Sequence, residues 1–251
     1  NYMIKNDNVI GFISAPCWLD PAPDELRALT HGKIIIQQTF VHPPEFDYSL
    51  KHITEITPHL ENAAFSLASA GCTIIASPAT PFGYIGYKNI TKSRLSLKKI
   101  EKISGVKCIS SISAIFDILE YKKLQKIALA WTYYPDEWRD LWASFVRASG
   151  YEVVGAQSLV NQGIRSKTNG EVEYPSSSEI MESVKKISEN YPNAEAIVIS
   201  GSGARTLAIT EQLKKISNRP VIAADTALFS IIAKQLDIKV PFVIWKVLII
   251  S

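Results

Sequence analysis

Short apolar runs alternate with amphipathic segments along nearly the whole chain. The apolar runs predict strands at Val9–Ser14, Lys33–Thr39, Cys72–Ser77, Val106–Ser110, Ile127–Thr132, Glu152–Gly155, Ala196–Ser200 and Val221–Ala224. Helical periodicity between them predicts helices at Leu50–Ala70, Ile90–Ile103, Ser113–Glu120, Asp136–Ser149, Ser178–Asn190, Arg205–Ile216 and Thr226–Gln235. Strands that are buried on both faces read as continuous Ile and Val runs, so this alternation predicts an α/β fold with parallel sheets flanked by helices.

The chain also contains internal matches that recur in the same order. Thr73–Thr80 resembles Ala196–Gly203, Ser113–Leu119 resembles Thr226–Ile232, and Val9–Ser14 resembles Ile127–Thr132. The offsets between the partners differ only by loop-sized amounts, which predicts a duplicated α/β half. We expect residues 1–115 to form the first half, 116–235 the second, and 236–251 a tail that packs back on the first half. Two such halves facing each other would leave a cleft lined by the loops at the carboxyl ends of the strands.

Hydroxyl groups occur in each loop that this arrangement places at the cleft. The loops are Ser14–Cys17, Ser77–Pro81, Thr132–Pro135 and Ser200–Arg205. Hydroxyls and free backbone N–H groups at a helix N-terminus favour an anion, and the glycines at 201 and 203 let the backbone approach a ligand closely. We therefore expect Ser14, Ser77, Ser200, Gly201 and Gly203 to bind substrate. The alternative for the glycine loop is a tight strand-to-helix turn.

The segments ATPFGYIG, IALAWTYYPDEW and AIVISGSGARTL, together with a helix that ends in Ala70-Gly71-Cys72, resemble the aspartate/glutamate racemase superfamily. The nearest branch is that of arylmalonate decarboxylase and maleate cis-trans isomerase. The resemblance implies two pseudo-symmetric flavodoxin-like halves, chemistry without a cofactor, and a small carboxylate-bearing substrate in the cleft between the halves.

The chain departs from this family at its catalytic thiols. Racemases and isomerases of the superfamily carry one cysteine after the strand in each half, and the decarboxylases keep only the second. Here the two positions fall on Ala79 and Gly201, neither of which can carry a proton. Cys72 begins its predicted strand and Cys108 lies within one, so neither replaces them, whereas Cys17 lies in a strand-end loop and stays open as a reactive thiol.

The part of the family site that remains is the part that holds an anion. The resemblance implies that Thr80 and Ser202 help to hold the substrate carboxylate, with Ala79 and Pro81 beside them. It also implies that Tyr133 closes the pocket, as a proton carrier, as an oxyanion donor or as a binding group only.

Three further residues are candidates for the site, each with an alternative. Asp225 follows its strand in an Asp-Thr pair that resembles the aspartate racemase branch, or it caps the next helix. His42 lies beside two prolines where the family carries a mobile flap, and it either takes part in acid–base chemistry or faces solvent. Arg205 either binds a second carboxylate or points into solvent.

Composition narrows the class of protein. The 251 residues are 47% hydrophobic and 20% charged, with a net charge of +3, which excludes intrinsic disorder. The densest basic cluster, Lys88, Lys92, Arg94, Lys98, Lys99 and Lys102, is more typical of a solvated helix face than of a nucleic-acid site. The chain has no dinucleotide or phosphate-loop glycine motif and no metal-ligand spacing, so we expect no cofactor and no metal. Without an apolar run of membrane-spanning length or a signal peptide, we expect a cytoplasmic protein without membrane or nucleic-acid partners, which can form a homo-oligomer.

These observations predict a cofactor-independent enzyme that acts on a small carboxylic acid or carbonyl compound through an enolate-like intermediate. A decarboxylation, a dehydration or a cyclisation needs fewer protein bases than racemisation does, so a lyase-type or cyclising reaction without cysteine is the leading hypothesis. Two alternatives stay open. One is a catalytically inactive family member that binds a carboxylate metabolite, and the other is a racemase or isomerase that uses Cys17.

Overall fold

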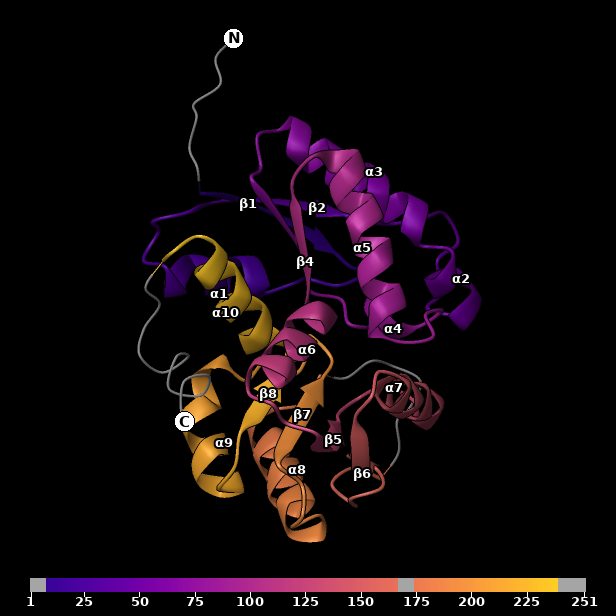
Figure 1. Ribbon diagram of the computed structural model, residues 1–251, viewed down its shortest axis with the longest axis vertical. Coiled ribbons are helices and arrows are strands. Elements are labelled where there is room, and N and C mark those ends of the chain that lie inside the picture. The colour runs from indigo at the N-terminus through magenta and orange to yellow at the C-terminus, as the bar shows by residue number, and fades with distance from the viewer. Residues whose placement is uncertain (1–7, 167–173, 239–251) are drawn as a thin grey trace.

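Two separate sheets, each of parallel strands, form the centre of the protein. The computed structural model describes residues 8–166 and 174–238 (Figure 1). The first sheet has the order β2-β1-β3-β4, with β1 Val9–Ser14, β2 Ile35–Phe40, β3 Ile74–Ser77 and β4 Lys107–Ser110. The second has the order β6-β5-β7-β8, with β5 Lys126–Trp131, β6 Glu152–Ser158, β7 Ala196–Ser200 and β8 Val221–Ala223. The same strand order in both sheets confirms the predicted α/β fold with two pseudo-symmetric halves.

Helices connect the strands and cover the sheets. In the first half they are α1 Ala22–Leu29, α2 Leu50–Thr54, α3 Thr57–Ser69, α4 Pro81–Tyr84, α5 Ile90–Ser104 and α6 Ser111–Tyr121. In the second they are α7 Asp136–Ala148, α8 Ser177–Asn190, the 3-10 helix η1 Leu207–Ile209, α9 Thr210–Ser217 and α10 Ala224–Gln235. The neighbouring pair α3 and α5 in the first half corresponds to the pair α8 and α9 in the second (Figure 1).

The halves join through α6 and α10, the helices that follow the last strand of each sheet. These two helices pack against each other in the middle of the molecule (Figure 1). Phe116 of α6, Trp142 of α7 and Phe229 of α10 belong to one buried apolar cluster that also contains strand residues of the first sheet. This cluster therefore spans both halves, and a second buried cluster, which includes Ile180, Ile199 and Leu213, lies in the second half. The proposed division at residue 115 lies inside α6, and the second sheet begins at Lys126.

Several predicted elements have different bounds in the structure. The helix predicted over residues 50–70 is two helices, because Pro58 at the start of α3 has no N–H to continue the preceding helix. The helix α1 and the short helix α4 were not predicted; both begin next to prolines, Pro21 and Pro23 for α1 and Pro81 for α4. The strand β6 extends to Ser158, beyond its predicted end.

In the part of the chain that the structure describes, no helix is long and apolar enough to cross a membrane. Most of the predicted C-terminal tail, residues 239–251, lies outside the described residues, so its packing on the first half stays a prediction.

Candidate active site

The strand-end loops of the two halves contact each other, as the duplication predicted. Tyr84 of α4, which follows β3, donates a hydrogen bond to the backbone carbonyl of Trp138 in α7 at 3.4 Å. Arg205, in the loop after β7, forms a bidentate ion pair with Glu25 of α1, which follows β1. At the boundary between the halves, the helix after β3 therefore meets the helix after β5, and the loop after β7 meets the helix after β1, so the pseudo-symmetry relates the two contacts to each other.

Tyr133, after β5, lies on the glycine loop that follows β7. The backbone N–H of Gly203 donates a hydrogen bond of 2.8 Å to the Tyr133 phenolic oxygen, and Tyr133 is 4% exposed. Gly201 has a φ of +99°, and a Cβ there would lie 2.9 Å from the Tyr133 ring. A cysteine at position 201 would be strained, because residues with a side chain rarely adopt this φ. Its Cβ would also clash with the Tyr133 ring, which occupies the space that a side chain there would need.

Buried hydroxyl groups stand at equivalent strand ends of the two halves. Thr80, between β3 and α4, is fully buried, and Ser200, the last residue of β7, is 1% exposed. Neither the Thr80 Oγ1 atom nor the Ser200 Oγ atom has a hydrogen-bond partner among the described residues. Buried polar groups in proteins are nearly always paired, so an unpaired hydroxyl near the end of each of the corresponding strands β3 and β7 points to a polar ligand.

The other serines near the strand ends differ in burial and in their hydrogen-bond partners. Ser202 is 3% exposed, and its backbone carbonyl accepts a hydrogen bond from Arg205 Nη1 at 2.8 Å. Ser77, at the end of β3, is half-buried and pairs in register with Ser110 of β4. Ser111, which the sequence analysis did not select, is 1% exposed at the start of α6, and its hydroxyl also has no partner among the described residues.

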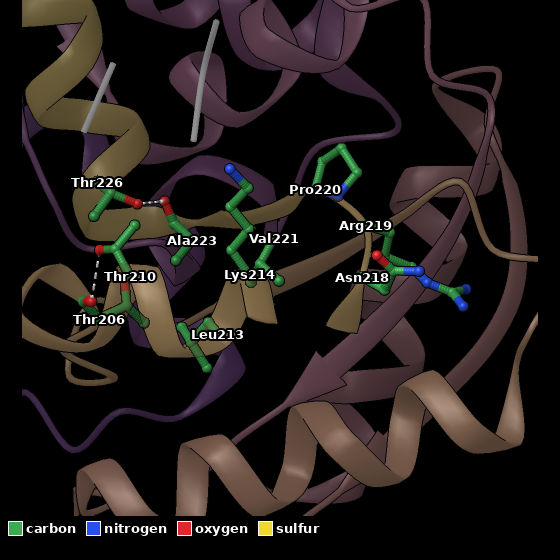
Figure 2. Close-up of a pocket in the computed structure, with 10 residues that line it drawn as sticks. All are labelled: Thr206, Thr210, Leu213, Lys214, Asn218, Arg219, Pro220, Val221, Ala223 and Thr226. Carbon is green, nitrogen blue, oxygen red and sulfur yellow. Dashed lines mark hydrogen bonds between the residues drawn. The ribbon is translucent and has the colours of Figure 1, made fainter. Parts of the chain in front are cut away.

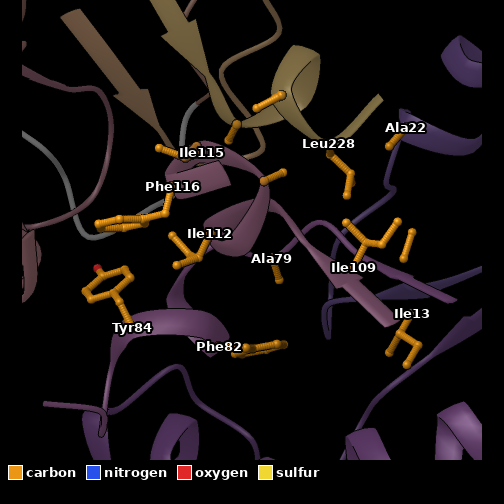
Figure 3. Close-up of a cluster of buried hydrophobic side chains, with 14 of the residues drawn as sticks. Ile13, Ala22, Ala79, Phe82, Tyr84, Ile109, Ile112, Ile115, Phe116 and Leu228 are labelled. Carbon is orange, nitrogen blue, oxygen red and sulfur yellow. The ribbon is translucent and has the colours of Figure 1, made fainter. Parts of the chain in front are cut away.

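Ala79 lies in an apolar environment. It is 5% exposed and belongs to the buried cluster drawn in Figure 3, together with Phe82 of α4 and Ile112 of α6. Pro81, also buried, begins α4. Ala79 and Pro81 therefore contribute apolar contacts, and the polar side chain between them in the sequence is Thr80.

Asp20 is a buried carboxyl group that the sequence analysis missed. It is 8% exposed; its Oδ2 atom accepts a hydrogen bond from Ser14 Oγ at 3.0 Å, and its Oδ1 atom accepts one from the N–H of Ala22 at 3.0 Å. Gln38 of β2 donates to the same Ser14 hydroxyl at 2.9 Å. Burial raises the pKa of Asp20, while the hydrogen bonds from Ala22 and Ser14 and the charge of Arg205 oppose the rise. An aspartate directly before a proline reads as a turn, so only its burial marks it as a candidate proton carrier.

Arg205 and Asp225 have structural partners. The Arg205 guanidinium is held by Glu25 and by the carbonyl of Ser202, so neither of the expected roles, binding a free carboxylate or facing solvent, describes its state here. Asp225 is 2% exposed and accepts hydrogen bonds of 2.6 Å from both the N–H and the hydroxyl of Thr206. It lies within α10 rather than at its N-cap, so the capping alternative is wrong. Both residues fix the loop after β7.

His42 lies beside Cys17 at the exposed edge of the first half. The His42 Nδ1 atom is 3.9 Å from the Cys17 Sγ atom, and both residues are exposed. Cys72 and Cys108 are buried, and burial raises the pKa of each thiol to about 11. Cys17 is therefore the cysteine that solvent can reach.

Aromatic rings line the same boundary, and most of them were not foreseen. The Tyr174 ring lies 5.4 Å from the Tyr133 ring and 6.1 Å from the Trp18 ring, measured between centroids. The Tyr134 ring lies 4.4 Å from that of Tyr133. Burial raises the pKa of Tyr133 and raises that of Tyr174 to about 12, so both phenols stay protonated at neutral pH. The residues that pack around Tyr133 thus form an apolar wall with neutral hydroxyl donors.

A cavity of about 260 Å³ lies elsewhere, on the second half beside β8. Figure 2 shows its lining, which includes Thr206, Lys214 and Thr226 but neither Thr80 nor Tyr133. Arg219 points away from the other lining residues there, and its guanidinium donates to the backbone carbonyls of Tyr191 and Ala194. Within residues 8–166 and 174–238, no three His, Cys, Asp or Glu side chains are grouped as metal ligands.

Comparison with solved structures agrees with this fold. Nocardia farcinica maleate cis-trans isomerase bound to TRIS superposes with a TM-score of 0.78 and 17% identity, covering 95% of this chain and 98% of its own. Maleate isomerase Iso from Pseudomonas putida S16 gives 0.73 and 16% identity, with 93% and 95% covered. A liganded arylmalonate decarboxylase mutant, with one glycine changed to cysteine and one cysteine to serine, gives 0.74 and 17% identity, with 90% and 92% covered.

At these identities the solved structures establish the fold alone, and no curated protein matches the chain. The family model of arylmalonate decarboxylase matches residues 48–240, which include Thr80, Tyr133 and the glycine loop after β7. Asp20, Cys17 and His42 lie outside that match. Because the matched part covers most of the sequence, the chain belongs to the arylmalonate decarboxylase family.

Proposed function

We propose that the protein is a cofactor-independent enzyme that acts on a small carboxylic acid between its two halves through an enolate-like intermediate. The observation that carries this proposal is the pair of buried hydroxyls without partners, on Thr80 and Ser200, at equivalent strand ends. The reaction we favour is of the lyase type, a decarboxylation or dehydration, or a cyclisation, without a catalytic cysteine.

A carboxylate or enolate oxygen is the group that these hydroxyls suit. Each hydroxyl loses its hydration when it is buried, and that loss is compensated only when the group forms a hydrogen bond. A charged oxygen accepts stronger hydrogen bonds than a neutral one. Thr80 and Ser200 would therefore hold the substrate anion, and donors of this kind stabilise an enolate more than a neutral ground state.

Tyr133 is suited to donate a hydrogen bond rather than to abstract a proton. Its phenolic oxygen accepts the Gly203 N–H, which fixes the ring and leaves its own O–H free to donate. Its O–H points to the Tyr134 hydroxyl at 3.5 Å, which is long for an O–H···O bond. Because burial raises its pKa, Tyr133 keeps its proton at neutral pH and would direct it toward a developing oxyanion.

Asp20 is the proton carrier that such a reaction needs. In a decarboxylation the C–C bond to the departing CO₂ breaks, and its electron pair forms the enolate. The carbon then takes a proton from an acid, and Asp20 in its protonated form would supply it. Burial raises the pKa of Asp20 and so favours that form. This role is argued from the burial of Asp20 and its hydrogen bonds with Ser14 and Ala22, and the family match does not bear on it, because Asp20 precedes the matched segment.

The experiment is a substrate panel with matched variants. Phenylmalonate, alkylmalonates and maleate are incubated with the protein, and proton NMR follows loss of CO₂, isomerisation and incorporation of deuterium from D₂O. Thr80→Val and Ser200→Ala should each lower turnover by about 10²-fold or more, as losing an oxyanion donor does. Ser183→Ala is the control, because Ser183 has an equally buried, unpartnered hydroxyl on α8, away from the strand ends, and should keep full activity.

The panel has two outcomes that overturn the proposal. If Thr80→Val and Ser200→Ala both kept the turnover of the wild type, the active site would not lie at the boundary between the halves. A compound that binds to the wild type without turnover, and binds less tightly to Thr80→Val, would establish the alternative of an inactive carboxylate-binding protein.

A second function is favoured by the distance of 3.9 Å between Cys17 Sγ and His42 Nδ1. An imidazole next to a thiol can accept its proton, and the resulting thiolate is a nucleophile or a base. In this second candidate, Cys17 replaces the missing family thiols in a racemase or isomerase. The test is Cys17→Ser, which would abolish isomerisation of maleate or racemisation if Cys17 carries the reaction.

A further inference from the structure

A broad groove of about 900 Å³ lies on the first half, away from the Tyr133 loop. It runs between the end of α2 with the first residue of α3, the residues in and after α4, and one face of α5. Its lysines are Lys88, Lys92, Lys98, Lys99 and Lys102. The lining contains lysines from the basic cluster noted in the sequence and no acidic residue.

The positive charge of this groove is not neutralised by the chain's own acids. Its lysines are exposed, and none of them forms an ion pair within the described residues. Three acids of α5 and α6 have other partners, since Glu101 pairs with Lys107 at 2.9 Å, and Asp117 and Glu120 pair with Arg94. Glu61, on α3, does not line the groove. Glu55, at the end of α2, does not line the groove. The groove therefore presents a concentrated positive surface to solvent.

The floor of the groove is apolar. Ile53, Phe82 and Ile85 are at most 6% exposed and form its base, and Leu95 on α5 is 47% exposed beside them. One wall carries hydroxyls, because Tyr87 donates to Ser96 Oγ at 2.8 Å. A solvated lysine face does not need an apolar floor, so the two features together fit a ligand with an anionic part and an apolar part.

We propose that this groove binds a small organic diphosphate whose apolar part contacts Ile53, Phe82 and Leu95. A volume of about 900 Å³ falls within the range of about 300–1,000 Å³ of small-molecule sites, whereas a nucleic acid would need a longer basic surface. Several lysines around one cavity suit a group with several negative charges, because each ammonium binds phosphate as a point charge. This site is separate from the carboxylate site of the proposed function.

Calorimetry with three related ligands tests the two parts of the proposal. Geranyl diphosphate carries both the head and the apolar chain, inorganic pyrophosphate carries the head alone, and geraniol carries the chain alone. We expect geranyl diphosphate to bind at least about tenfold more tightly than either part, and its affinity to fall with added salt because the charges are exposed.

Matched variants locate the binding. Lys92→Gln with Lys99→Gln should raise the Kd for geranyl diphosphate by about tenfold or more. Leu95→Asp should weaken the binding of geranyl diphosphate more than the binding of pyrophosphate. The control removes the same charge from the second half with Lys185→Gln and Lys215→Gln, both exposed, and should leave the Kd unchanged.

Three results would overturn the proposal. Equal affinity for pyrophosphate and geranyl diphosphate would show that the floor is not used. An unchanged Kd in the Lys92, Lys99 variant would place the ligand elsewhere. Co-sedimentation with phosphatidylserine vesicles that geranyl diphosphate does not displace would assign the lysines to a membrane surface instead.

Discussion

The phenolic oxygen of Tyr133 accepts a hydrogen bond of 2.8 Å from the backbone N–H of Gly203. This contact joins the loop after β5 to the loop after β7, and it places a neutral, buried O–H beside Gly201, where a Cβ would meet the Tyr133 ring. A donor that is already oriented does not have to reorganise when charge develops on the substrate, which is the main source of oxyanion stabilisation in enzymes.

Tyr133→Phe removes the hydroxyl and keeps the ring. We expect turnover of any substrate from the panel to fall by about 10²–10³-fold. The free energy of unfolding should fall by only about 1–3 kcal/mol, since the N–H of Gly203 loses its acceptor. Steady-state kinetics and urea unfolding measure the two effects, and full activity in the variant would show that Tyr133 is not part of the site.

The ion pair of Arg205 with Glu25 should act on stability. The pair is largely buried and joins α1 to the loop after β7, so Glu25→Gln leaves the Arg205 guanidinium with a weaker partner. We expect a loss of about 1–3 kcal/mol in the free energy of unfolding, measured with urea. If Glu25→Gln kept its stability but had a higher KM, the result would instead indicate that Arg205 binds substrate.

Asp20→Asn should lower turnover without a matching loss of stability. Burial raises the Asp20 pKa in the folded state, so ionisation of Asp20 opposes folding as the pH rises through that value. Asparagine keeps the size and stays neutral, so its stability relative to the wild type should be higher at pH 7 than at pH 3.5. Turnover at pH 7 should fall by about 10²–10⁴-fold. If turnover were unchanged, another group would have to be the proton carrier.

Thiol labelling distinguishes the two candidate functions. Iodoacetamide at pH 8 should modify Cys17 in the native protein and leave Cys72 and Cys108 unmodified, because burial raises the pKa of both thiols to about 11. Peptide mass spectrometry locates the label. The cysteine-free mechanism predicts that Cys17→Ser and the labelled protein retain most of their activity, and loss of activity in both would favour the thiol mechanism.

The strands and their repetition in two halves could be predicted, because buried parallel strands carry continuous apolar runs and the same runs recur in the second half. The helix α1 was missed because its two prolines, at 21 and 23, read as a loop, although proline at a helix start is compatible with its geometry. The break before α3 also comes from a proline, since Pro58 interrupts the helix that the apolar periodicity around it predicts.

The candidate site was less predictable. The resemblance indicated Thr80 and Tyr133. Whether a hydroxyl is buried and hydrogen-bonded depends on the residues packed around it, and the sequence does not show these contacts. Arg205 and Glu25 pair across most of the chain length, and no local pattern links them. Asp20 precedes a proline in an ordinary turn sequence, so its burial against Ser14 follows only from the packing of α1 onto the first sheet.

The central claim is that the boundary between the halves binds a small carboxylate. A crystal structure of the protein with bound phenylmalonate tests it most directly. We predict carboxylate oxygens within hydrogen-bond distance of Thr80 Oγ1, Tyr133 Oη and Ser200 Oγ. Phenylmalonate bound instead in the cavity beside β8, with the hydroxyls of Thr80 and Ser200 still unpaired, would contradict the claim.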